Sequence, residues 1–143
     1  EPLQQWTKGN VTILGDAANL ASRLEGINKQ FGTYTLVSEA ALAAAGPGLA
    51  AREMGRVGVV GRRAPVRVFE PMSPETWSAR AADREAFAVG LEAFYAGRFA
   101  EAAARFEARQ AFDPPAAAYF RKCRELLERP PADWAGVWVA DEK

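Results

Sequence analysis

An apolar stripe with helical spacing follows a short β-rich run near the start of the chain. The stripe recurs at spacings of four, three and four residues, at Leu20, Leu24, Ile27 and Phe31. This is the pattern of an amphipathic helix. Asp16 is well suited to cap its N-terminus and Gly32 to end it. Residues 11–14 (VTIL) are the β-rich run, and we expect them to form a strand that leads directly into this helix.

The rest of the first half continues this alternation. Residues 33–37 (TYTLV) predict a strand, and residues 38–45 (SEAALAAA) predict a short helix with Ser38 at its cap. Residues 51–70 predict two strands joined by the turn GRRAP. Strands interleaved with helices indicate an α+β or α/β fold.

The second half is rich in Ala, Arg, Glu and aromatic residues. Three helical stripes are marked by Phe87, Leu91 and Phe94, by Phe99, Ala102 or Ala103 and Phe106, and by Tyr119, Cys123 and Leu126. We expect residues 73–82 to form a linker and residues 83–129 a small α-helical extension. Residues 130–143 form a tail with two tryptophans and no clear period.

Composition excludes several classes of protein. The chain has 18 basic and 18 acidic residues, with 8 basic and 6 acidic residues up to Met72, so neither half has the excess of a nucleic-acid surface. No apolar run is long enough to span a membrane. The single cysteine, Cys123, suits a reducing compartment, so we expect a cytoplasmic domain whose parent is either free or membrane-anchored.

The chain contains no histidine. This absence excludes Ser-His-Asp and Cys-His catalysis, zinc bound by histidine and a histidine general base. Any chemistry must use carboxylates, amides, hydroxyls, cations or metals held by oxygen.

Two polar residues flank the apolar stripe of the first helix. Asn19 and Arg23 are four residues apart and share one face. A guanidinium suits phosphate oxygens, and an amide suits a hydroxyl or a ribose. Taken alone, such a pair is more often merely solvated.

The motif GDAANLASRLE at residues 15–25, with the strand–GRRAPV–strand hairpin that follows, resembles the C-terminal half of the catalytic domain of class III nucleotidyl cyclases. The resemblance covers roughly residues 11–70. It implies a partial ferredoxin-like α+β domain over residues 1–72, which works as a homodimer with its site at the interface.

The resemblance also implies roles for individual residues. Asn19 would orient the ribose, and Arg23 would stabilise charge on the α-phosphate as the 3′-hydroxyl attacks. Thr12 would contact the base, and a threonine there favours adenine over guanine. Arg62 in the hairpin turn would contact the triphosphate, with Arg63 the weaker candidate.

In this family two aspartates from the N-terminal half of the domain hold two metal ions, Mg²⁺ or Mn²⁺. That half and a base-reading lysine are not in this sequence, which begins without an initiator methionine. We expect a fragment of a longer protein that is inactive in isolation. Asp16 is better placed to cap a helix than to bind metal.

The helical part resembles one tetratricopeptide repeat, with suitable residues at Gly90, Gly97, Phe99, Ala102, Phe106 and Pro114. A single repeat cannot build a solenoid. The helices therefore either pack against the catalytic domain or extend its dimer, or they dock a regulatory protein.

The sequence thus predicts part of an adenylate cyclase that converts ATP to cyclic AMP and pyrophosphate. The alternative is a degenerate cyclase-like domain that serves as a dimerisation or nucleotide-sensing module with a helical protein-binding arm. Guanylate cyclase activity stays open, since half of the base-reading pair lies upstream.

Overall fold

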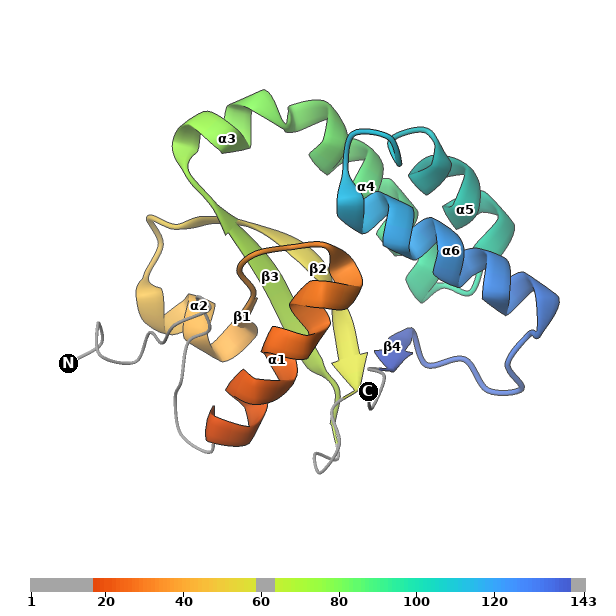
Figure 1. Ribbon diagram of the computed structural model, residues 1–143, viewed down its shortest axis with the longest axis horizontal. Helices are drawn as coiled ribbons and strands as arrows, with labels where there is room; N and C mark the ends of the chain where they lie inside the picture. The colour runs from red at the N-terminus through yellow and green to blue at the C-terminus, as the bar shows by residue number, and fades with distance from the viewer. Residues whose placement is uncertain (1–16, 59–63, 140–143) are drawn as a thin grey trace.

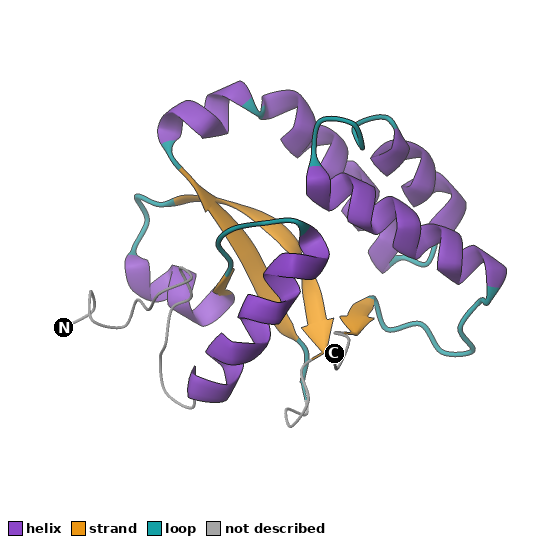
Figure 2. Ribbon diagram, in the orientation of Figure 1, coloured by secondary structure: helices purple, strands orange, loops and turns teal. Residues whose placement is uncertain are grey.

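The computed structural model describes residues 17–58 and 64–139, and for residues 17–23 it describes the backbone alone. Helices and a four-stranded sheet give a mixed α+β architecture (Figures 1 and 2). The elements in chain order are α1 (Ala17–Phe31), β1 (Val37–Ser38), α2 (Glu39–Ala45), β2 (Ala50–Gly58), β3 (Val66–Met72), α3 (Pro74–Ala79), α4 (Ala81–Tyr95), α5 (Phe99–Glu107), α6 (Pro114–Glu128) and β4 (Val137–Val139).

The sheet has the strand order β1-β3-β2-β4. The expected hairpin is present, because β2 and β3 pair antiparallel with Arg56 opposite Arg67. β1 pairs antiparallel with β3, whereas β4 pairs parallel with β2 and places Trp138 opposite Val57. A strand from the end of the chain therefore lies beside a strand from its first half.

Local sequence signals explain where several helices begin. The hydroxyl of Ser38 accepts a hydrogen bond of 3.1 Å from the backbone N–H of Ala41, which caps α2 as expected. Ser73 caps α3 in the same way through Thr76, and Pro74 occupies the first turn. None of the helices in the described ranges is both long and apolar enough to cross a lipid bilayer.

Two segments differ from expectation. Residues 33–37 are not a strand throughout, because the N–H groups of Gly32 and Thr33 both donate to the carbonyl of Asn28 and complete the end of α1. Regular pairing begins only at Val37. Residues 73–82, expected as a linker, contain α3 and the start of α4, because the Ser73 cap with Pro74 starts a helix.

One continuous hydrophobic core joins the first helix, the sheet and the helical part. It includes the expected stripe residues Leu24, Ile27 and Phe31, which are fully buried, together with Phe87, Phe94, Phe106 and Cys123. Figure 1 shows α4, α5 and α6 gathered beside the sheet, and α5 packs against both of the others. The three expected helices of the second half are confirmed, and they share their core with the first half of the chain.

The Tyr119 ring lies at the centre of this core. Its centroid is 4.8–5.6 Å from the rings of five other aromatic residues, Phe31, Phe87, Phe94, Phe106 and Trp138. Its hydroxyl donates a 2.8 Å hydrogen bond to the backbone carbonyl of Met54 in β2. Gly55 has φ +142° and lies where a Cβ would collide with that hydroxyl, so glycine lets Tyr119 reach the strand.

Candidate functional site

The four residues predicted to contact a nucleotide are only partly placed. Asn19 and Arg23 both fall on α1, as expected, and their side chains lie outside the described part of the structure. Thr12 and Arg62 lie outside the described residues, as does the proposed cap Asp16. The structure therefore informs the candidate nucleotide site through the position of the α1 backbone.

α1 is anchored firmly at its C-terminal end. Gly32 has φ +73°, and a Cβ there would lie 2.7 Å from the Cβ of Pro114, so the end of α1 meets the start of α6. The buried hydroxyl of Thr33 donates a 2.6 Å hydrogen bond to the side-chain oxygen of Asn28. These contacts fix the end of the helix that is farther from Asn19.

Two aromatic residues from the C-terminal part of the chain hold the same end. Phe31 stacks on Tyr119 at 5.6 Å and meets the edge of Trp138 at 4.8 Å. The indole N–H of Trp138 donates a 2.9 Å hydrogen bond to the side-chain oxygen of Gln30. Neither tryptophan of the tail had an assigned role in the sequence, and the structure places Trp138 against the helix that carries Asn19 and Arg23.

Arginines on the strands of the hairpin have partners within the fold. Arg67 pairs with Glu53 at 2.6 Å and with Glu39 at 2.8 Å. The Arg56 guanidinium lies 4.4 Å from the Tyr95 ring centroid. Arg67 is therefore paired with two carboxylates, and Arg62 and Arg63 lie outside the described residues.

Glu53 on β2 accepts hydrogen bonds through both of its carboxylate oxygens. One oxygen accepts from Arg67. Its second oxygen accepts a 2.6 Å hydrogen bond from the Tyr95 hydroxyl. Partial burial by itself raises the pKa of the Glu53 carboxyl, but the hydrogen bonds from Arg67 and Tyr95 outweigh it and lower the pKa below its usual value. Burial and the adjacent Glu53 raise the pKa of Tyr95, so its phenol stays protonated.

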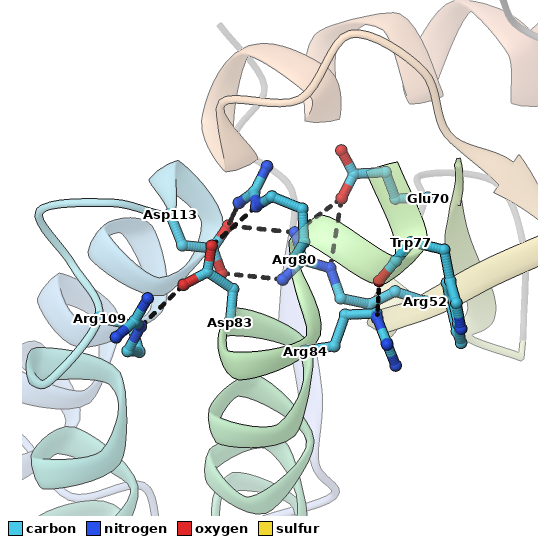
Figure 3. A network of polar contacts seen from close by, with 8 residues as sticks. All are labelled: Arg52, Glu70, Trp77, Arg80, Asp83, Arg84, Arg109 and Asp113. Atoms are coloured by element: carbon cyan, nitrogen blue, oxygen red, sulfur yellow. Dashed lines mark hydrogen bonds and ion pairs between the residues drawn. The ribbon is translucent and has the colours of Figure 1, made fainter. Parts of the chain in front are cut away.

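A buried ionic network connects the sheet to the helical part (Figure 3). Arg52 on β2 donates two hydrogen bonds to Asp113, at 2.8 and 3.1 Å, and one of 2.7 Å to Glu70. Arg80 donates a 2.8 Å bond to Asp113 and a 2.7 Å bond to Asp83. The arginines and carboxylates thus neutralise one another, which offsets the free-energy cost of burying their charges.

Sequence analysis missed this network, because its members show no periodicity and its charges become partners only in the fold. Burial by itself raises the pKa of Asp83, but hydrogen bonds from Arg109 and Arg80 lower it below its usual value. The arginines satisfy the carboxylates, so the network is structural. Among the described residues, no group of three or more His, Cys, Asp and Glu side chains is placed to hold a metal ion.

A cavity of about 360 Å³ lies between β2, α3 and α4. Its walls include the rings of Trp77, Phe87 and Tyr95, and Arg84 stacks on Trp77 at 3.8 Å. Among the described residues, those that line it come from these three elements and not from α1. The described part of α1, which carries the predicted nucleotide contacts nearer its N-terminus, thus contributes no wall to this cavity.

Comparison with known proteins finds a partial relative. A stretch of 59 residues is 39% identical to a protein named Adenylate cyclase 1 from Rhizobium meliloti (strain 1021), which covers 41% of this chain and 9% of that protein. No family model matches the chain, and no solved structure matches it. The chain thus contains a region similar to part of an adenylate cyclase.

Proposed function

We propose that this chain is the C-terminal half of a class III adenylate cyclase catalytic domain with a helical extension, and that its parent converts ATP to cyclic AMP and pyrophosphate. The observation that carries the proposal is the 59-residue similarity to Adenylate cyclase 1. The motif with Asn19 and Arg23 on α1 and the antiparallel β2–β3 hairpin support it. A ferredoxin-like arrangement of the complete domain is part of the proposal.

The proposed chemistry assigns a task to each polar group. The amide of Asn19 orients the ribose, while the guanidinium of Arg23 stabilises the negative charge that grows on the α-phosphate. A cation held in place for that charge stabilises the transition state more than the ground state. Thr12 reads the adenine edge, and Arg62 contacts the triphosphate.

The other side of the site is proposed to come from outside this chain. The resemblance implies a homodimer and two aspartates that bind Mg²⁺ or Mn²⁺, which would activate the ribose hydroxyl and neutralise phosphate charge. We assign this chain only the ribose, phosphate and base contacts. The isolated 143 residues should therefore form no cyclic AMP.

The proposal is tested in the full-length parent by measuring cyclic AMP formed from ATP with Mg²⁺ or Mn²⁺. Arg23→Ala should lower kcat by roughly 100-fold or more, since one positioned donor in a preorganised site contributes about that much. Asn19→Ala should also lower kcat. Lys29→Ala is the matched control, because it removes an exposed cation from the same helix and should leave kcat unchanged.

Three results would contradict the proposal. These are a parent that forms no cyclic AMP, an Arg23→Ala variant that turns over at the normal rate, and cyclase activity in the isolated chain. A parent that binds ATP without turnover would instead indicate the nucleotide-sensing module. Formation of cyclic GMP in preference to cyclic AMP would overturn the adenine assignment of Thr12.

A further inference from the structure

Trp138 connects the last strand of the chain to the first helix. Its side chain is 5% exposed, and β4 holds its backbone opposite Val57 of β2. From this position its ring lies 4.8 Å from Phe31 and its indole N–H bonds to Gln30 at 2.9 Å. Trp138 therefore contacts α1 from a strand that is paired with β2.

These contacts act on α1 far from the residues with proposed catalytic roles. Asn19 precedes Phe31 by 12 positions, which is about 18 Å along a helix that rises 1.5 Å per residue. A tilt of about 5° at the anchored end would move the backbone of Asn19 by roughly 1.5 Å. A displacement of about 1 Å in a positioned catalytic group can cost about 100-fold in rate.

We propose that Trp138 is a positioning residue for the cyclase site. Through Phe31 and Gln30 it fixes the direction of α1, and thereby the placement of Asn19 and Arg23, so the C-terminal strand is part of the catalytic unit. The inference rests on the proposed function for its catalytic consequence. The structural step, that Trp138 orders α1, is separate and is measured separately.

The chain offers a closely matched control in the other tryptophan of the same tail. Trp134 also donates its indole N–H, over 2.8 Å, to the backbone carbonyl of Phe94. Its ring packs on Phe94 at 5.1 Å and on Phe99 at 4.9 Å. Trp134 thus resembles Trp138 in chemistry and position in the chain, but it packs on α4 and α5, whereas Trp138 lies between α1 and Tyr119 of α6.

The catalytic test compares variants of the full-length parent. Trp138→Ala should lower kcat about tenfold or more while the KM for ATP stays within about twofold, because orientation is lost and the binding groups remain. Trp134→Ala should reduce thermal stability and leave kcat within about twofold. Equal effects of both substitutions on kcat would overturn the proposal.

A smaller substitution tests the same contact in a variant that keeps the Trp138 ring in the core. Gln30→Leu removes the acceptor for Trp138, whereas Gln30→Glu keeps an oxygen there. The leucine variant should lower kcat severalfold and the glutamate variant should restore most of it. If both variants have normal kcat, the hydrogen bond does not position α1 and this part of the proposal fails.

Amide hydrogen exchange in the 143-residue chain separates the two hypotheses. Trp138→Phe should speed exchange along α1 by about tenfold relative to the same substitution at Trp134. If the parent proves inactive but this difference appears, the proposed function fails while the structural step stands. If the parent is active and exchange in α1 is the same in both variants, the positioning role fails and the proposed function stands.

Discussion

The buried carboxylate of Asp113 gives a quantitative test of how the helical part is attached. Asp113 is 0% exposed and accepts hydrogen bonds from Arg52, which is 5% exposed, and from Arg80. Removal of one partner from a buried ion pair costs about 3–5 kcal/mol. Because Arg52 keeps Glu70 at 2.7 Å, we expect Asp113→Ala to cost about 3 kcal/mol, near the lower limit of that range.

The free energy of unfolding is measured in urea on the 143-residue chain, and thermal unfolding should show a fall in Tm of about 10 °C. Glu101→Ala is the control, because its exposed pair with Arg98 contributes only about 0.5 kcal/mol. In a double-mutant cycle, the variant with both Arg52→Ala and Asp113→Ala should lose clearly less free energy of unfolding than the sum of the losses in the two single variants.

The reasoning would be refuted if Asp113→Ala lowered the free energy of unfolding by less than about 1 kcal/mol, no more than Glu101→Ala does. Additive single and double variants would refute the claim that Arg52 and Asp113 stabilise one another. Either result would mean that the Arg52–Asp113 pair does not help to join the sheet to the helices.

Three further predictions concern the core and its charges. Gly55→Ala should destabilise the chain by about 2 kcal/mol or more in urea unfolding, because a Cβ would meet the Tyr119 hydroxyl and the backbone has positive φ. Since the pKa of Glu53 is lowered in the fold, its contribution to stability is full above the ordinary glutamate pKa and is lost as pH falls through the lowered value. Urea titrations from pH 7 to pH 3 should therefore show a shallower decline for Glu53→Gln. Burial raises the pKa of Cys123 to about 12, so iodoacetamide should label it only when the chain unfolds, and rapid labelling of the folded chain would contradict its burial.

The sequence predicted most of the helices, because their signals are local. Leu24, Ile27 and Phe31 recur with helical spacing and are fully buried, and Ser38 caps the helix that follows it. The hairpin was also predictable, since two apolar runs flank a turn.

One element could not be predicted, because a long-range contact determines it. Residues 137–139 show no strand pattern in the sequence, and they form β4 only through pairing with β2. By contrast, α3 has a local signal in Ser73 followed by Pro74, which the linker expected over residues 73–82 leaves out. For the candidate site, the motif suggested Asn19 and Arg23, while Trp138, which contacts their helix from the far end of the chain, carried no signal in the sequence.

The motif at residues 15–25, the exclusion of histidine-based catalysis and most of the helices follow from the sequence alone, since each depends on composition or on residues close together in the chain. How the two parts of the chain combine follows from the tertiary structure. Arg52 meets Asp113 across 61 positions, and Gln30 meets Trp138 across 108. Such pairs form because burial requires each polar group to find a partner, and the fold decides which partner is near.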